Sequence, residues 1–388
     1  MREVQVKPCA QLQVTHDGDL LNIHWPGRPS SRFHAVWLRD NGQDDRTRDP
    51  SNRQKLVRLQ DLPLQTSIRS ATLDGNGRLD LVFAPDHWHT HIDLEWLWNH
   101  RYDRSPPRGL VPDHRTTWDS GIFDRIPVLE YDDVRSDPAR LLQWLETIDR
   151  FGVSVMKGLP ERNAAILDAI ALFGFVRETN YGKYFEVRSE TNPANLAYTP
   201  RGLQPHTDNP YRDPVPGLQF LGCIENRAQG GESVVVDGFR AAEILQHESP
   251  EGFALLARYP AQFEFRGMKG VHLQSARPMI ECSGHGQLAG VRFNNRSCDA
   301  LTAVPFEKMA AYYTAYRRLG ELVESADLQG VFKLEPGDVL VTDNTRVLHG
   351  RTAYHGEGNR WLQGAYADKD SLGSKIRILK QEAGPGAS

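Results

Sequence analysis

Cysteines are few in this chain, and long apolar runs are absent. Only four of the 388 residues are cysteines, namely Cys9, Cys223, Cys282 and Cys298, and no two of them form a Cys-x-x-Cys pair. This spacing argues against a disulfide framework and against a cysteine zinc site, so we expect ordinary buried thiols. No stretch reaches the roughly 18 apolar residues that span a bilayer, and the N-terminus does not resemble an apolar signal segment. We therefore expect a cytoplasmic protein.

A charge excess of one sign is missing as well. The 46 Lys and Arg residues nearly balance the 50 Asp and Glu residues, which leaves a formal net charge of -4 and a pI near 6.4. The basic residues are scattered along the chain, so neither nucleic acid nor an anionic membrane is an expected partner. The 39% hydrophobic and 25% charged residues are ordinary for a globular protein. The expected partner is a small molecule.

The N-terminal part has the pattern of a small antiparallel β domain. Over residues 1–98, short alternating segments such as "LQVTHDGDLLNIHW", "HAVWLRD" and "SIRSATLDGNGRLDLVFAP" are separated by Asp-Gly turns. Residues 99–123 are rich in Pro, Arg and Asp without periodicity, and this predicts a linker. A second domain should follow over residues 124–382, with a short tail at 383–388.

The second domain mixes helical and strand patterns. Amphipathic spacing predicts helices within 137–152, 162–176 and 305–325, with Asp137 as the cap of the first. β segments include "GLQFLGCIEN", "GGESVVVDGF", "QFEFRG", "LAGVRFNN" and "GDVLVTDNTRVLHG". Many short strands with glycine turns and a few outer helices predict an α+β protein whose second domain is a β sandwich or jelly roll.

A His-x-Asp pair stands in the proline-rich stretch "LQPHTDNPYRDPVP" (203–216). In an extended segment, residues i and i+2 project from the same face, so His206 and Asp208 can point at one metal ion. Such a pair also arises by chance among 14 histidines, as hydrogen-bonded surface neighbours. A metal site therefore needs a third ligand.

The candidate third ligand is His349, in "GDVLVTDNTRVLHGRTAY", although a histidine taken alone is more often structural than ligating. Arg360 follows 11 residues later, at the start of the strand-like "RWLQGAYAD". Two histidines and one carboxylate leave three metal positions open, as in non-heme Fe(II) oxygenases. A nearby arginine can then bind the far carboxylate of a 2-oxoacid. A non-catalytic cupin-like metal-binding module and a zinc hydrolase stay open as alternatives, although neither requires the arginine.

Several motifs in order resemble the Fe(II)/2-oxoglutarate dioxygenases of the taurine dioxygenase type, and within them the γ-butyrobetaine and trimethyllysine hydroxylases. They are "AVWLRDN", "ETNYG", "NLAYT", "PHTDNP", "GGESVVVDGF", "VRFNN", "PGDVLVTDN", "LHGR" and "LQGAYAD", and the resemblance runs over nearly the whole chain. The resemblance implies a double-stranded β-helix catalytic domain of the cupin-like kind. It also implies Fe(II) on His206, Asp208 and His349, 2-oxoglutarate on Arg360, O2 as second cosubstrate, and a homodimer.

The resemblance also implies a substrate class. In the butyrobetaine hydroxylases an aromatic cage holds a trimethylammonium group, and the matching positions are Tyr181, Phe185, Tyr198 and Tyr366. A quaternary cation has no N–H to donate, so ring faces are its natural partners. The asparagines that hold the anionic end of the substrate match Asn195 and Asn294.

Two departures from the family pattern stand out. The resemblance implies a structural zinc in the N-terminal domain, but Gly42, Asp44, Thr47 and Trp88 occupy the ligand positions, so we expect no structural zinc. The histidines of "DHWHTH" (86–91) then look like a solvated turn. The other departure is Arg296, which adds a cation where the substrate anion should lie. It favours 2-(trimethylammonio)ethylphosphonate, hydroxylated next to phosphorus, with γ-butyrobetaine as the alternative; Arg296 could instead face solvent or pair with Asp299.

Overall fold

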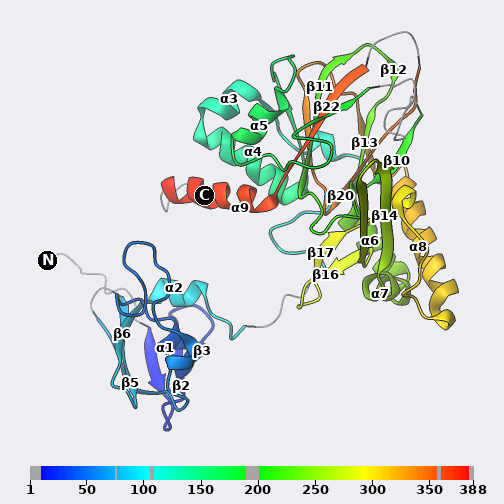
Figure 1. Cartoon of the computed structure of the whole chain (residues 1–388). Helices are drawn as coiled ribbons and strands as arrows, with labels where there is room; N and C mark the ends of the chain where they lie inside the picture. Colours follow the sequence, from blue (N-terminus) through cyan, green and yellow to red (C-terminus); the bar gives the residue numbers. More distant parts are fainter. Residues whose placement is uncertain (1–9, 75–76, 105–108, 189–200, 356–359, 384–388) are drawn as a thin grey trace. The chain divides into compact units, whose positions relative to one another are not determined.

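The structure is a computed structural model that describes residues 10–74, 77–104, 109–188, 201–355 and 360–383. The chain divides into two compact units, residues 1–106 and 107–388 (Figure 1). The division falls inside the stretch 99–123 that the sequence predicts as a linker. Trp118 and Ile122 are buried in the core of the second unit, so the later part of that stretch belongs to it. No helix of the described part of the chain is long and apolar enough to cross a membrane.

The first unit contains two three-stranded antiparallel sheets, ordered β1-β2-β3 and β4-β5-β6. Alternating side chains such as Leu79, Leu81 and Phe83 point inward and form its core. The elements are β1 Gln11–Val14, β2 Leu20–His24, β3 Ser31–His34, α1 Ala35–Asp40, β4 Ser67–Leu73, β5 Arg78–Ala84, β6 His89–Asp93 and α2 Leu94–Asn99.

Two local predictions for this unit are wrong. The segment "HAVWLRD" is helix α1 rather than a strand, because its buried residues Ala35, Leu38 and Arg39 recur at three- and four-residue spacing. The stretch "DHWHTH" is a turn only at its start, since β6 begins at His89 and pairs with β5.

The four positions that would carry zinc in the resembling family hold a different cluster. The Asp44 carboxylate accepts hydrogen bonds from the hydroxyls of Thr47, at 2.7 Å, and Thr90. These bonds outweigh the effect of burial and lower the pKa of Asp44. The guanidinium groups of Arg39 and Arg46 lie 3.8 and 4.1 Å from the centre of the Trp88 ring. Hydrogen bonds to the Asp44 carboxylate and cation–π contacts with Trp88 therefore join the segment after α1 to the residues around the start of β6.

The second unit is built on two sheets. The larger is six-stranded, in the order β7-β8-β19-β11-β22-β9, and the smaller is four-stranded, in the order β10-β20-β13-β18. All pairings are antiparallel except β7 with β8. The strands are β7 Val128–Glu130, β8 Val153–Lys157, β9 Phe185–Val187, β10 Leu203–His206, β11 Leu218–Asn226, β13 Ser233–Asp237, β18 Gln329–Phe332, β19 Val339–Asp343, β20 Val347–Arg351 and β22 Arg360–Ala367.

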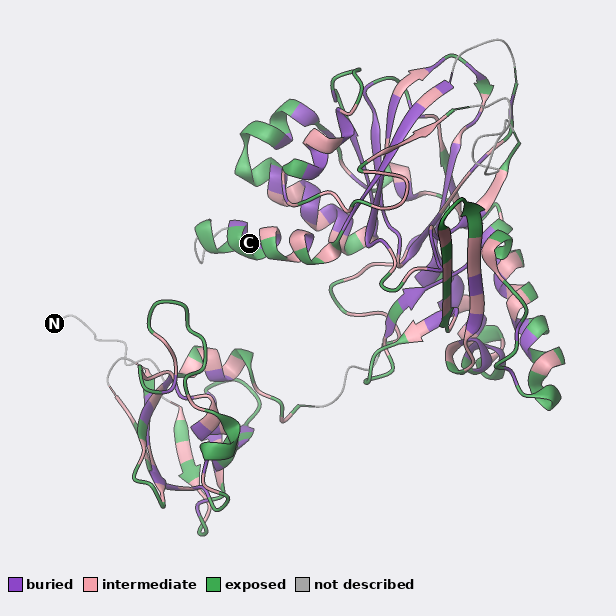
Figure 2. Cartoon of the chain, viewed as in Figure 1, coloured by how far each residue is buried: buried purple, intermediate pink, exposed green. Residues whose placement is uncertain are grey.

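Strand alternation divides the larger sheet into an outer and an inner face. On β11, Leu218 and Phe220 pack against the helices α4, α5 and α9, whereas Gln219 and Leu221 point to the other side. The inner face shares one apolar core with the smaller sheet, because Val155 and Leu340 pack with Val235 and Val347. The two sheets therefore face each other, and β13, β19 and β22 are buried along most of their length (Figure 2).

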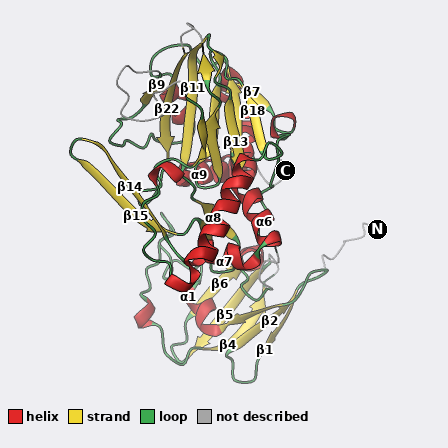
Figure 3. Cartoon of the chain, turned by 90° about the vertical axis from the view of Figure 1, so that its right-hand side faces the viewer, coloured by secondary structure: helices red, strands yellow, loops and turns green. Residues whose placement is uncertain are grey.

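The helices lie outside the sheets. The predicted cap is confirmed, since Asp137 accepts a hydrogen bond from the Ala139 amide at the start of α4. The helix predicted at 162–176 is shorter than expected, and α9 was not predicted. Helices α6, α7 and α8 pack on one another beside the hairpin β14–β15 (Figure 3). The remaining elements are α3 Tyr131–Ser136, α4 Pro138–Phe151, α5 Ile166–Ala171, α6 Gly238–Glu248, α7 Pro250–Arg258, α8 Met309–Glu324, α9 Lys369–Glu382, β12 Gln229–Gly230, β14 Ala261–Met268, β15 Val271–Arg277, β16 Ile280–Cys282, β17 Leu288–Val291 and β21 Tyr354–His355.

Candidate active site

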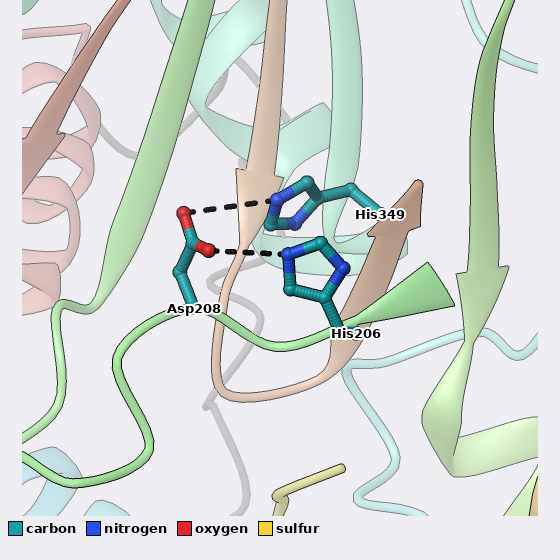
Figure 4. Close-up of side chains that lie close together, drawn as sticks. All are labelled: His206, Asp208 and His349. Atoms are coloured by element: carbon teal, nitrogen blue, oxygen red, sulfur yellow. Dashed lines mark ion pairs between the residues drawn. The ribbon is translucent and has the colours of Figure 1, made fainter. Parts of the chain in front are cut away.

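Two adjacent strands bring the predicted metal ligands together. His206 ends β10 and lies directly opposite His349 of β20 in the antiparallel register, while Asp208 follows two residues after β10. The Nε2 atom of His206 is 3.3 Å from Oδ1 of Asp208, and the Nε2 atom of His349 is 3.7 Å from Oδ2 (Figure 4). The potential ligand atoms of the three residues lie within 4.8 Å of one another. Residues 143 positions apart in the sequence, 206 and 349, thus meet at one point.

The surrounding backbone fixes two of these ligands. The carbonyl oxygen of Gln204 lies 2.8 Å from Nδ1 of His206, which places the proton on Nδ1 and leaves Nε2 for a metal. Asn344 accepts a hydrogen bond from the Asp208 amide, at 2.6 Å, and donates one to the Asp208 carbonyl, at 3.0 Å. Asn344 therefore holds the loop that carries the carboxylate.

The charge states of the cluster suit a metal ion. Burial acts to raise the pKa of Asp208, but His349 and His206 and the hydrogen bonds to the carboxylate lower it overall. Burial lowers the pKa of His349 to about 3, so its imidazole is neutral near pH 7. A carboxylate and neutral imidazoles are the forms that bind a divalent cation. The three residues therefore fit an iron ion.

A cavity of about 400 Å³ opens beside the triad. Arg360 lines it from the first position of β22 and is 7% exposed. Its Nε and Nη1 atoms are buried without a hydrogen-bond partner in the described part of the chain. Burial and the neighbouring Arg351 lower the pKa of Arg360 to about 10, so it remains a cation near neutral pH. A buried guanidinium with unused donors fits the far carboxylate of 2-oxoglutarate.

Three of the four predicted cage aromatics line the same cavity. The ring centres of Phe185 and Tyr366 are 5.3 Å apart, and those of Tyr181 and Phe185 are 6.0 Å apart. Phe265 of the β14–β15 hairpin extends this cluster, because its ring centre lies 6.1 Å from that of Tyr181. No local sequence pattern predicts this contact, because it depends on how the hairpin folds back. Tyr198 lies outside the described residues.

Two of the three residues predicted for the substrate anion, Asn294 and Arg296, also line the cavity, while Asn195 lies outside the described residues. Asn294 uses its side chain within the protein: Oδ1 accepts from the Ser297 amide, and Nδ2 donates to the Thr207 carbonyl at 3.1 Å. Arg296 has its Nη2 atom 2.8 Å from Nε2 of His206. The guanidinium of Arg296 thus reaches the triad, although the residue as a whole is exposed.

Two further residues of the site were not predicted from the sequence. Gln219 of β11 places its amide nitrogen 2.5 Å from Oδ2 of Asp208 and 2.9 Å from Nε2 of His349. Arg351, at the end of β20, lines the cavity together with Arg360. Arg351 stands in the "HGR" motif beside the predicted ligand His349 and could have been found there, whereas no local pattern distinguishes Gln219 from an ordinary strand residue.

Fold and site together define a metal-dependent enzyme, with a His-Asp-His cluster, a buried arginine and a cavity between them. A family model described as taurine catabolism dioxygenase TauD, TfdA family, matches residues 121–366, and a γ-butyrobetaine hydroxylase-like N-terminal model matches residues 12–98. The chain belongs to the TauD, TfdA family. It is a non-heme iron dioxygenase that uses Fe(II) and 2-oxoglutarate.

Three relatives illustrate how far the similarity extends. γ-Butyrobetaine dioxygenase of Pseudomonas sp. (strain AK-1) is 32% identical over 368 residues, which cover 93% of this chain and 94% of that protein. The Homo sapiens γ-butyrobetaine dioxygenase is 31% identical, with coverage of 95% and 96%. A mitochondrial trimethyllysine dioxygenase of Bos taurus is 28% identical, with coverage of 91% and 84%. The similarity therefore includes both units.

Proposed function

We propose that this enzyme hydroxylates a small trimethylammonium compound with an anionic far end, and that 2-(trimethylammonio)ethylphosphonate, hydroxylated next to phosphorus, is the favoured substrate. Residues 124–382 would form the catalytic domain, with the two facing sheets as a double-stranded β-helix. The observation that carries the proposal is that an aromatic cluster and Arg296 line one cavity and both contact metal-ligand residues.

The aromatic cluster supports the cationic end. Tyr181, Phe185 and Tyr366 offer ring faces to a group that cannot donate a hydrogen bond, and each such contact contributes about 0.5 to 2 kcal/mol. The Tyr366 hydroxyl donates a hydrogen bond to Oδ2 of Asp208 at 2.7 Å. A cation on the Tyr366 ring would therefore lie next to the metal-binding carboxylate.

Arg296 supports the anionic end. It contacts His206 while Tyr366 contacts Asp208, so a short substrate that reaches from one to the other passes over the triad. A guanidinium presents a fork of donors to a tetrahedral oxyanion, which suits a phosphonate with up to two charges. Asn294 keeps one amide hydrogen for the same group, because only one of its two is used in the described contacts. The charge of Arg296 favours the phosphonate over a singly charged carboxylate.

Different residues of the site would bind the iron, the 2-oxoglutarate and the substrate. His206, Asp208 and His349 would hold Fe(II), which with 2-oxoglutarate and O2 supplies the oxidising power to hydroxylate an unactivated C–H bond. Arg360 binds the 2-oxoglutarate carboxylate and fixes its orientation. The aromatic rings and the hairpin residue Phe265 exclude water and hold the substrate by its cation. The protein thus contributes binding and alignment.

γ-Butyrobetaine is the second candidate. The two relatives named γ-butyrobetaine dioxygenase match nearly the whole chain at 32% and 31% identity. Its trimethylammonium group would use the same aromatic cluster and its carboxylate the same end of the cavity, with a weaker attraction to the charge of Arg296.

The test compares kcat/KM for the two compounds in the wild-type enzyme and in Arg296→Ala. We expect the wild type to prefer the phosphonate. Loss of a charge-assisted hydrogen bond, about 1.5 kcal/mol or more, should reduce that preference roughly tenfold. Arg266→Ala, which removes another arginine from the cavity lining, is the control that should leave the preference unchanged. A preference for γ-butyrobetaine, or one that survives loss of Arg296 within a factor of about three, contradicts the phosphonate proposal.

A further inference from the structure

The two oxygens of the Asp208 carboxylate have different surroundings. Oδ2 accepts two hydrogen bonds, from the Gln219 amide at 2.5 Å and from the Tyr366 hydroxyl at 2.7 Å. Oδ1 faces Nε2 of His206 at 3.3 Å (Figure 4). Gln219 and Tyr366 therefore both donate to Oδ2, and neither donates to Oδ1, the oxygen that faces His206.

Both donors come from the six-stranded sheet, opposite the strands that carry the histidines. Gln219 of β11 and Tyr366 of β22 are direct cross-strand partners, and Gln219 is also the direct partner of Thr342 on β19. The Thr342 hydroxyl donates to Oε1 of Gln219 at 3.4 Å. Gln219, Thr342 and Tyr366 are each at most 5% exposed. Three neighbouring strands thus form a buried chain of hydrogen bonds that ends on Asp208.

The orientation of the Gln219 amide follows from this chain. An ionised carboxylate only accepts hydrogen bonds, so the NH2 group of Gln219 must face Asp208 and its oxygen must face Thr342. The same nitrogen lies 2.9 Å from Nε2 of His349, the atom that a metal requires. The bond to Asp208 is the one compatible with a bound metal.

We propose that Gln219, oriented by Thr342, is a positioning residue that holds Asp208 to the metal through a single oxygen. To chelate a metal, Asp208 would have to withdraw Oδ2 from two buried donors and leave both without a partner, which is costly. Binding through one oxygen keeps three metal positions free, and these are needed for the two oxygens of a 2-oxoacid and for O2. A chelating carboxylate would occupy one of them.

The experiment uses the metal-free full chain and Co(II) in place of iron, so it needs no turnover and no substrate. Gln219→Leu removes the amide, and Thr342→Val removes the orienting hydroxyl with little change of shape. Loss of contacts that orient a metal ligand typically lowers metal affinity 10- to 100-fold, so we expect roughly that loss in Gln219→Leu and a severalfold loss in Thr342→Val. The visible absorption of bound Co(II), which reports its coordination, should change in the same variants. The 2-oxoglutarate affinity of the Co(II) protein should also fall.

Gln363→Leu is the matched control. Gln363 is a buried glutamine on β22, 1% exposed, but it bonds to Asn163, Glu186 and Ala164 and does not line the cavity. It should bind Co(II) and 2-oxoglutarate like the wild type. Because Thr342 acts through Gln219, adding Thr342→Val to Gln219→Leu should have no further effect.

Three results would overturn the proposal. One is a folded Gln219→Leu protein with wild-type Co(II) absorption and affinities within a factor of about two. Another is equal losses in Gln219→Leu and Gln363→Leu. If Gln219→Leu does not fold, Thr342→Val decides the question, and an unchanged Co(II) spectrum with unchanged affinities in that variant rejects the role of Gln219.

Discussion

Among the ligand residues, His349 depends most on packing for its orientation. The Gln204 carbonyl fixes the ring of His206, whereas Nδ1 of His349 is buried without a hydrogen-bond partner in the described ranges. Burial keeps His349 neutral. Protonation of this ring therefore places a charge in a buried site, where the nearby Asp208 carboxylate offsets only part of the cost of burial.

This gives a pH dependence for the metal-free protein. The pKa of His349 is about 3 when folded and about 6.5 when unfolded, so between these values the unfolded chain binds the extra proton and stability rises with pH. Between pH 7 and pH 5, His349 should cost the wild type about 2 kcal/mol of unfolding free energy. Urea unfolding should show a smaller decline in His349→Gln, which cannot take up the proton. Asp208 does not interfere, because its lowered pKa affects stability only below about pH 4. Parallel declines in the two proteins would refute this role of His349.

Arg360 should control the affinity for 2-oxoglutarate. Its Nε and Nη1 atoms are buried and unused by the described protein groups, so Arg360→Ala leaves a carboxylate in a partly dry site without its partner. Loss of charge-assisted hydrogen bonds, each about 1.5 to 3 kcal/mol, should raise the KM for 2-oxoglutarate tenfold to a hundredfold or more. Arg360→Lys keeps the charge but loses the paired N–H donors of the guanidinium, so its KM should lie between those of the wild type and Arg360→Ala. Succinate release at varied 2-oxoglutarate measures this. An unchanged KM in Arg360→Ala would move the anchor elsewhere.

The sequence was sufficient for the residues that carry the chemistry and insufficient for those that orient them. His206, Asp208, His349 and Arg360 stand in recognisable local patterns, and the structure brings the first three together beside the cavity that Arg360 lines. Gln219 and Thr342 matter because they are partners across β11 and β19, in a register that forms between segments more than 120 residues apart. No local pattern reveals such a pairing.

At the scale of elements, a buried ion pair joins strand β13, helix α6 and the approach to β20. Asp237 ends β13, and Arg346 immediately precedes β20; both side chains are fully buried. The Arg346 guanidinium donates to both Asp237 oxygens, at 3.0 and 2.8 Å, and Asp237 also accepts from the Phe239 amide at the start of α6. This pair fixes the start of the strand that carries His349.

Arg346→Met should therefore destabilise the second unit strongly. It leaves the Asp237 carboxylate buried without its cation, which typically costs 3–5 kcal/mol, roughly 6 °C or more in melting temperature. Adding Asp237→Asn removes the stranded charge and retains an acceptor for the Phe239 amide, so the double variant should recover part of the loss. Thermal unfolding followed by circular dichroism measures both. A single variant within about 1 °C of the wild type would contradict this account.

At the scale of the whole molecule, the two units are stabilised in different ways. The second unit has a core large enough to cover both faces of a six-stranded sheet. The first unit is smaller, and its chain between α1 and β4 contains only one short helical turn, Leu59–Asp61. Local contacts such as Asp44 with Thr47 and Thr90, and Arg39 and Arg46 with Trp88, connect this segment to α1 and β6. The homodimer and the cytoplasmic location stay predictions.

The first unit should accordingly be stable without zinc. Gly42, Asp44, Thr47 and Trp88 offer one carboxylate and no thiolate or imidazole, a donor set that cannot form a structural zinc site. A Cβ atom at Gly42 would lie 2.5 Å from the Thr90 hydroxyl, so the space is filled by the Asp44 cluster.

We expect metal analysis of the His206→Ala/His349→Ala double variant, which lacks the iron triad, to find no stoichiometric zinc. Tryptophan fluorescence should report the unit well, because it holds Trp25, Trp37, Trp88, Trp96 and Trp98, five of the eight tryptophans. A chelator should leave its unfolding curve unchanged, since there is no metal–ligand free energy to remove. One tightly held zinc per chain in that variant, or a chelator-induced shift of the curve, would show that the unit binds a metal through residues other than these four.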